Sequence, residues 1–242
     1  MEWDNVGLLV GRPGREVRRV LVALDITEAV ADEAERWGAE LIVAHHPVIF
    51  RGAKSVTDRE PVGRTLLALL EGGISAVCMH TNLDVAPGGV NDALAEALGL
   101  EEPGPLRADG LGRVGTLAEA RPLEAFAGDV CRILDCNGLR YADGGKPVRR
   151  VAVGGGACGD CIPDVLAAGC DTFVTADLSY HVFLDAAQQG LNLIDAGHFP
   201  TENGICGRLV SYLGGAFPDL EVRQSTVHRE VIRYVQGADA GK

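Results

Sequence analysis

The stretch VRRVLVALDITEAVADEAERWGAELIVAHH, residues 17–46, decides the fold of this chain. It opens on an apolar run of strand length, 18–24, continues as an amphipathic segment of helical length, 26–38, and returns to an apolar run, 40–46. Apolar strands that alternate with amphipathic helices are typical of α/β proteins, whose parallel strands are covered on both faces. The stretch therefore predicts a strand, a helix and a second strand that ends in two adjacent histidines.

The second half of the chain repeats this pattern in register. Residues 148–177, VRRVAVGGGACGDCIPDVLAAGCDTFVTAD, align with 17–46 without a gap, and the glycines that end the two helices coincide. A second match, at a different offset, sets LLEGGISAVCMHT over DAAQQGLNLIDAGH and pairs Gly73 with Gly190. We interpret the two halves as related α/β lobes. The alternative is a chance likeness, because all βαβ units share the same periodicity.

From this repeat we predict an α/β fold of two related lobes, with mixed, largely parallel sheets packed around a metal-binding crevice. The first lobe is expected to span 1–100 and the second 148–242, with 101–147 as the connecting segment of one two-lobed domain. Ligands of open α/β sheets bind beyond the carboxyl ends of the strands. The crevice is therefore expected at the strand ends of the two lobes.

Composition and charge exclude several classes of function. A chain of 242 residues with 47% hydrophobic residues can bury a large core, and its net charge of −12 argues against nucleic acid or an anionic membrane as a partner. The longest apolar runs fall far below the ~20 residues of a membrane span. The seven cysteines are an odd number, and no secretory leader precedes the first strand. We predict reduced thiols and a cytoplasmic protein.

Three segments place metal-ligand side chains directly after apolar strands. They are AHHP with His45 and His46, HTNLD with His80 and Asp84, and DAGHFPTE with Asp195, His198 and Glu202. A single histidine or aspartate at a strand end is commonly a hydrogen-bonded or capping residue, but three such segments in one chain indicate a shared site. Histidine nitrogen with carboxylate oxygen suits zinc, manganese, iron or cobalt better than calcium.

The adjacent pair His45 and His46 raises a geometric problem. Successive side chains on a strand point to opposite faces, so both histidines reach one ion only if the backbone turns there. We interpret them as ligands of two different ions that shared carboxylates hold together, with Glu202 or Asp84 as the bridge. Two ions ~3.5–4 Å apart can lower the pKa of a shared water and clamp a substrate oxygen.

Taken in order, these motifs resemble those of a known family. EWDNVGLLVG, HHPVIF, HTNLDVAPGGVND, GLGRVG, GGG, TADLSYH and DAGHFPTE occur as in the Nif-three-like dinuclear-metal hexamer family, whose bacterial members are named GTP cyclohydrolase I type two homologues. The resemblance runs from Trp3 to about Leu213. It leaves His80 a supporting role and implies five metal ligands, namely His45, His46, Asp84, His198 and Glu202.

The resemblance also implies cofactors, partners and an activity. The cofactors are two divalent metal ions per chain, either zinc, iron or manganese, and the partners are copies of the chain itself in a homohexamer built as a trimer of dimers. The implied activity is that of a metal-dependent hydrolase, similar to GTP cyclohydrolase, which acts on a nucleotide-like or phosphorylated small molecule. The alternative is a non-catalytic hexameric metal-binding scaffold or a regulatory interaction protein.

Histidines and opening residues outside these ligand segments carry weaker signals. His181 in LSYH follows a strand of the second lobe and is a candidate catalytic general acid, with a structural histidine as the alternative. The polar groups of Trp3, Asp4 and Asn5 are expected to line the site, and His228 is expected at the surface.

Two further patterns are compatible with other functions, namely dinucleotide binding and cysteine chemistry. GGGACG, residues 154–159, fits the GxGxxG of dinucleotide-binding loops, but only a short helix can follow it before Pro163, so we favour a tight turn. Cys158 and Cys161 form a CxxC, which could be a redox pair or half of a zinc site. We favour incidental reduced thiols, since the sequence has no second CxxC.

Overall fold

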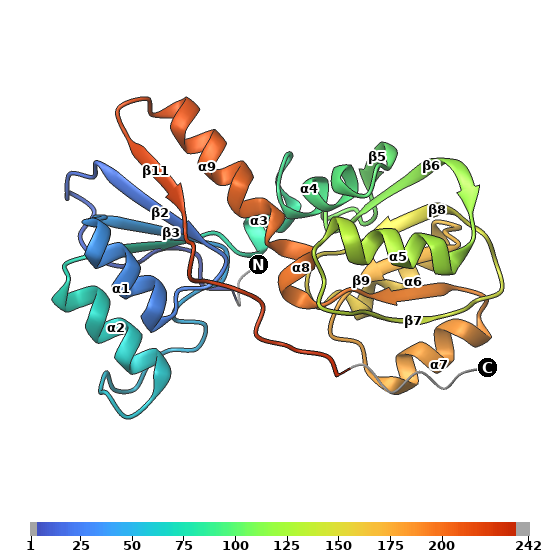
Figure 1. Cartoon of the computed structure of the whole chain (residues 1–242), viewed down its shortest axis with the longest axis horizontal. Coiled ribbons are helices and arrows are strands. Elements are labelled where there is room, and N and C mark those ends of the chain that lie inside the picture. The colour runs from blue at the N-terminus through green and yellow to red at the C-terminus, as the bar shows by residue number, and fades with distance from the viewer. Residues whose placement is uncertain (1–3, 236–242) are drawn as a thin grey trace. The chain divides into compact units, whose positions relative to one another are not determined.

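The computed structural model describes residues 4–235 (Figure 1). By their internal contacts these residues form two compact units. The first contains residues 4–93 and 203–229, and the second contains residues 94–202 and 230–235. Each unit is built on one mixed β-sheet, so the predicted α/β class with two lobes is confirmed.

The first unit has a five-stranded sheet in the order β1-β4-β3-β2-β11. Four of its strands run parallel, and β1 is antiparallel to β4. The strands are β1 (Gly7–Val10), β2 (Arg19–Ala23), β3 (Leu41–Ala44), β4 (Ser75–Cys78) and β11 (Glu221–Gln224). The helices are α1 (Glu28–Trp37), α2 (Pro61–Glu71), α3 (Thr81–Val85), α9 (Gly204–Ala216) and the first part of α4 (Val90–Ala97).

The opening stretch of sequence folds as its pattern predicts. Thr27 accepts a hydrogen bond from the backbone N–H of Val30 (3.3 Å) and so caps the start of α1, and Gly38 ends the helix with a left-handed φ of 76°. Helices α1 and α2 contact each other beside the sheet (Figure 1). They bury alternate side chains of β2 and β3, such as Leu21 and Ile42, so the core of the unit lies between these strands and the two helices.

The second unit has a six-stranded sheet in the order β5-β6-β8-β9-β10-β7. Its three central strands run parallel, and the other pairings are antiparallel. The strands are β5 (Glu101–Pro105), β6 (Arg113–Arg121), β7 (Arg140–Ala142), β8 (Val148–Val153), β9 (Thr172–Thr175) and β10 (Asn192–Asp195). The helices are α5 (Leu123–Ile133), the 3₁₀ helix η1 (Gly159–Cys161), α6 (Ile162–Ala167), α7 (Tyr180–Gln188) and α8 (His198–Glu202).

The parallel strands of this second sheet are buried on both faces. Along β8, Val151 and Val153 pack with residues of α5, whereas Ala152 between them packs with residues of α6 and α7. On the neighbouring β9, Val174 and Phe173 divide between the two faces in the same way. Burial on both faces explains why these strands are nearly continuous apolar runs in the sequence.

The structure reproduces both internal repeats at their predicted offsets. Strand β3 coincides with β9, and at the second offset β4 coincides with β10 and α3 with α8. Carboxylates at equivalent positions also make equivalent contacts. Glu40 accepts hydrogen bonds from the backbone N–H groups of two consecutive arginines at 2.8 and 3.0 Å, and Asp171 does the same at 2.7 and 3.0 Å. Because the hydrogen bonds match as well as the strands, shared periodicity alone does not explain the repeat.

The boundaries of the two units differ from the predicted lobes. Residues 101–147 are not a connecting segment, because they supply β5, β6, α5 and β7 to the second unit. Residues 203–229 belong to the first unit, where β11 pairs with β2. Periodicity could not reveal this return, because β11 is short, polar and mostly exposed and its partner lies near the other end of the chain.

The structure also bears on the predictions made from composition. All seven cysteines are free thiols, as predicted, and Cys158 and Cys161 are buried in the core with residues of α6. Their burial favours the incidental packing role over a redox pair. Within residues 4–235, no helix has both the length and the apolar character needed to span a membrane.

Candidate metal centre

Three neighbouring parallel strands of the first unit are followed by polar side chains. Asp25 comes after β2, His45 and His46 come after β3, and His80 comes after β4. Because β3 pairs with both β2 and β4, the carboxyl ends of the three strands meet at one edge of the sheet. This is the edge at which open α/β sheets bind ligands.

The backbone turns at the two adjacent histidines. Strand β3 ends at Ala44, and residues 45 and 46 form a bend. The ring centroids of His45 and His46 are 4.9 Å apart, and the His80 ring lies 5.4 and 5.8 Å from them. One ring nitrogen of each histidine lies within 4.8 Å of the other two. The condition under which adjacent histidines can reach one ion is therefore met, and His80 joins them.

Each histidine of this cluster is anchored through its Nδ1 atom. His45 Nδ1 donates to a backbone carbonyl at 2.8 Å, and a carbonyl can only accept. The Nδ1 atoms of His46 and His80 lie 2.7 Å from the carboxylates of Asp25 and Asp4, respectively. In a neutral ring, a proton on Nδ1 leaves the lone pair on Nε2, which is then able to bind a metal. The three side chains are thus oriented so that each presents the Nε2 lone pair as a metal ligand.

Asp4 ties the opening segment of the chain to the end of β4. Its side chain is 1% exposed and accepts hydrogen bonds from His80 Nδ1, from the Thr81 N–H (3.0 Å) and from the Thr81 hydroxyl (2.5 Å). Burial raises the pKa of Asp4, but these hydrogen bonds outweigh burial and lower the pKa to about 2. Asn5 donates to a backbone carbonyl of the loop after β3, and Trp3 lies outside the described residues.

Asp4→Asn is expected to lower the stability of the metal-free protein by about 2 kcal/mol near pH 7, because folding lowers the pKa of this carboxyl from 3.8 to about 2. A carboxyl whose pKa is lowered by folding stabilises the native state above its unfolded pKa. The difference between wild type and variant should therefore shrink as the pH falls from about 4 towards about 2. Urea unfolding across this range measures it, and a difference independent of pH would contradict the proposed role.

Asp84 completes the candidate ligands of the first unit. It lies in α3, is buried, and places Oδ1 3.5 Å from His45 Nε2. The side-chain amide of Asn91 donates to its backbone carbonyl at 2.9 Å and so holds the short helix in place. Two predicted ligands, His45 and Asp84, are thus brought together by consecutive parallel strands.

His198 and Glu202 form a second group, at the carboxyl end of β10. Both lie on α8, where the four-residue spacing brings His198 Nε2 to 3.1 Å from a Glu202 carboxylate oxygen. Asp177, which follows the neighbouring β9, lies 2.7 Å from His198 Nδ1. His198 therefore repeats the arrangement of the first unit, with a carboxylate on Nδ1 and with Nε2 directed towards a second ligand.

A glycine makes room for the Glu202 carboxylate. Gly156 follows β8 with a φ of +65°, and a Cβ atom there would lie 2.2 Å from Glu202 Oε1 and 3.1 Å from His198 Nε2. The Gly156 N–H donates to Thr201 (3.0 Å), and its carbonyl accepts from Thr175 (3.0 Å). Because this N–H already has a partner within the protein and α6 is only one short helix, the loop does not resemble a dinucleotide site.

Two other predicted residues occupy different surroundings. Asp195 is buried and accepts hydrogen bonds from Arg140 and from the N–H of Leu178, so it has a structural role in the second unit. His181 lies exposed in the first turn of α7 and packs edge-on against Tyr180, with ring centroids 5.3 Å apart. Among residues 4–235 its side chain forms no hydrogen bond or ion pair, and its catalytic role stays a prediction.

A chain of polar contacts that was not predicted from the sequence lies behind His46. Asp25 accepts from His46 with one carboxylate oxygen and lies 2.9 Å from His228 Nε2 with the other, so His228 is not the solitary surface residue that we predicted. Glu33 of α1 holds this part of the chain by accepting a hydrogen bond from Ser225. Burial raises the pKa of Asp25, but the hydrogen bonds from the two histidines hold it well below its usual value.

The two groups share the chemistry of a transition-metal site. Each offers neutral imidazole nitrogen beside carboxylate oxygen, a donor set that suits zinc, iron or manganese. The carboxylates that hold the Nδ1 atoms are outer partners of the kind that orient metal-bound histidines. No cysteine of the described chain belongs to either group. The residues present therefore fit a bound divalent ion.

Comparisons with known proteins match nearly the whole chain. Residues 1–230 match the family model described as Duf34/NIF3 (NGG1p interacting factor 3). Two proteins named GTP cyclohydrolase 1 type 2 homolog are similar: that of Clostridium perfringens is 36% identical over 207 residues (83% of this chain, 79% of that protein), and that of Streptomyces coelicolor is 41% identical over 212 residues (83% and 74%). A solved structure of a Bacillus cereus protein related to NIF3 superposes with a TM-score of 0.89 at 28% identity, and covers 97% of this chain and 94% of that one.

Proposed function

We propose, because this chain belongs to the Duf34/NIF3 family, that it is a metal-dependent hydrolase of a nucleotide-like or phosphorylated small molecule. One observation carries the proposal: the three predicted ligand histidines, His45, His46 and His198, each hold Nδ1 on an acceptor and so present Nε2, and the neighbouring His80 is held in the same way. Such uniform anchoring is what metal ligands require. The name of the relatives, GTP cyclohydrolase 1 type 2 homolog, makes GTP the first substrate to test.

We assign two divalent ions per chain to five ligands, which are His45, His46, Asp84, His198 and Glu202. The donor types support this assignment, because each group offers an imidazole nitrogen beside a carboxylate oxygen. Glu202 is proposed as the bridging carboxylate, and Asp84 is the competing candidate.

The protein's own contribution is to fix the histidines of the site in one tautomer and one orientation. Asp25, Asp4 and Asp177 each lie 2.7 Å from a histidine Nδ1, so ring rotation would break a charge-assisted hydrogen bond. Bound ions would supply Lewis-acid polarisation and a water of lowered pKa. His181 is proposed as a general acid, because it is exposed and follows the strand end that carries Asp177.

Steady-state hydrolysis by the metal-loaded protein tests the proposal. The panel contains GTP, other nucleoside triphosphates, phosphomonoesters and unphosphorylated nucleosides, and His198→Ala is the variant with a removed ligand. We expect turnover of at least one phosphorylated compound and a loss of at least about 100-fold in the variant. If protein that retains its metal turns over no compound, the hydrolase proposal fails and the scaffold alternative is favoured.

We further propose that the chain assembles as a cytoplasmic homohexamer, a trimer of dimers. Family membership and the seven free thiols support this proposal. Sedimentation at micromolar concentration is expected to show a species of about six times the 25.4 kDa chain mass. A monomer alone under these conditions would overturn the proposal.

A further inference from the structure

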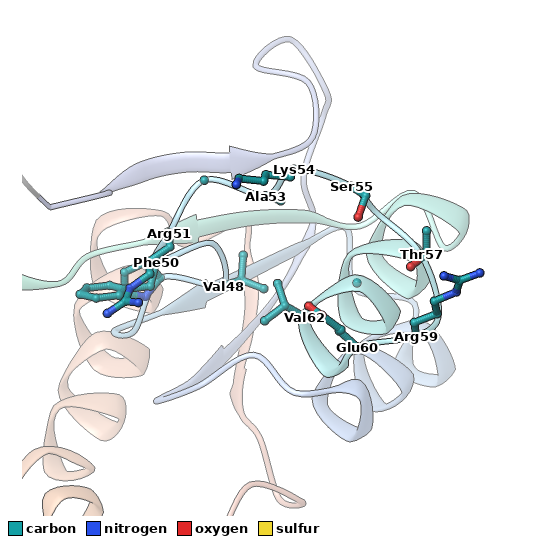
Figure 2. A pocket seen from close by; sticks show the side chains of 13 residues that line it. Val48, Phe50, Arg51, Ala53, Lys54, Ser55, Thr57, Arg59, Glu60 and Val62 are labelled. Carbon is teal, nitrogen blue, oxygen red and sulfur yellow. The ribbon is translucent and has the colours of Figure 1, made fainter.

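The loop between β3 and α2 lines a cavity of about 960 Å³ in the first unit (Figure 2). Val48, which is buried, and Val62 of α2 give it an apolar centre, towards which both side chains point. Lys54 and Ser55 border it from the opposite stretch of the loop. The volume is that of a small-molecule site.

The side chains around this cavity carry mainly positive charge. Arg51, Lys54 and Arg59 line it, and Glu60 is the one acidic residue among the lining residues. None of the three cations forms an ion pair or a hydrogen bond through its side chain with another residue of the range 4–235. Three cations without a protein partner, around one cavity of a chain with net charge −12, favour an anionic ligand.

The start of α2 adds to this positive potential. Val62 and Gly63 of the first turn line the cavity, and Pro61 before them has no N–H. The Glu60 side chain at the N-cap position forms no capping hydrogen bond, so it leaves the amides of the first turn to another acceptor. The N-terminus of a helix attracts anions through these amides and through its dipole.

An aromatic ring links the cavity to the histidine cluster. Phe50 lines the cavity, is 51% exposed, and lies edge-on to His80 with ring centroids 6.0 Å apart. An exposed aromatic face next to candidate metal ligands can stack a planar heterocycle. The cavity thus offers cations at its rim and an aromatic ring at the end beside His80.

We propose that this cavity binds the phosphate groups of a nucleotide, whose base stacks on Phe50 beside the histidine cluster. Arg51 and Lys54 contact the phosphates, while Ser55 and Thr57 supply hydroxyl hydrogen bonds. The reacting end of the substrate is then the base, and the phosphates serve for binding alone. This orientation rests on the proposed hydrolase function, whereas phosphate binding in the cavity does not.

Calorimetric titration with inorganic pyrophosphate, GTP and guanosine tests the assignment on the full-length protein. The variant Arg51→Ala/Lys54→Ala should bind pyrophosphate and GTP at least about tenfold more weakly, since each lost contact is a charge-assisted hydrogen bond. Arg12→Ala/Arg36→Ala is the matched control: it removes two exposed arginines outside the cavity and should change either affinity less than about twofold. Metal content, measured for each variant, should stay that of the wild type.

Phe50→Ala tests the position of the base. The variant should bind guanosine and GTP about tenfold more weakly, as expected for the loss of one stacking contact, and its affinity for pyrophosphate should stay unchanged. Two results would overturn the cavity assignment. One is an equal loss of pyrophosphate affinity in the cavity variant and in the control variant, and the other is a wild type that binds neither pyrophosphate nor GTP. If binding behaves as expected but no compound of the hydrolysis panel is turned over, only the hydrolase proposal falls.

Discussion

Gly156→Ala is expected to reduce metal affinity at the His198–Glu202 group by about 10- to 100-fold. The new Cβ would lie 2.2 Å from Glu202 Oε1, which is closer than any real contact, and the flexible end of the glutamate is what would move. A displaced carboxylate no longer points at its ion. The measurement is metal retention against a competing chelator, followed by elemental analysis of the protein.

Gly169→Ala separates this effect from backbone strain. Gly169 has a φ of +70°, close to the +65° of Gly156, but a Cβ there would meet nothing within 4 Å. Both variants should therefore lose about 1–2 kcal/mol of stability, the penalty of an L-residue in the left-handed region. Only Gly156→Ala should lose metal. Equal metal retention in the two variants would mean that Glu202 is not a ligand.

His45→Ala and His46→Ala should each remove mainly one ion and leave about half of the metal content, if the two histidines serve different ions. Glu202→Ala should weaken the binding of both ions, because a bridging carboxylate is a ligand of each. Metal stoichiometry per chain, measured by elemental analysis on protein purified without added metal, gives the result. His181→Ala is the control, because that side chain is exposed and belongs to neither ligand group.

The bend at the two adjacent histidines defines the competing outcome. His45, His46 and His80 lie close enough to surround a single ion. In that arrangement the wild type would hold one ion in the first unit, and His80→Ala would remove it as completely as either neighbour. A dinuclear centre in which His80 has only a supporting role instead predicts that His80→Ala keeps both ions, bound more weakly.

The parallel strands and most candidate ligands could be predicted from the sequence, because both depend on local pattern. Strands β3 and β9 were predicted from their apolar runs, and His45 and His198 from their positions after strands. Residues 101–147 were misassigned, because their strands pair antiparallel at the side of the parallel core and lack its continuous apolar character. The return of β11 to β2 is a contact between distant parts of the sequence, which no local pattern encodes.

Two outer partners of the histidines, Asp25 and Asp177, were missed for a related reason. Asp25 meets His46 across two neighbouring strands, so the contact depends on strand order, which the sequence leaves open. Asp177 could have been predicted as a site residue, since it occupies the position of His46 in the second copy of the repeat. An equivalent position in a repeat can thus indicate a site residue even when the residue type differs.

The pairing of β11 with β2 has a consequence for the order in which the chain folds during synthesis. The sheet of the second unit uses strands between residues 101 and 195, whereas the first sheet is completed only by residues 221–224. A ribosome therefore releases every strand of the second unit before the first unit can close. Until then β2, with its buried Val20 and Val22, is an open edge that can pair with another chain. Truncation before residue 221 would make that transient edge permanent.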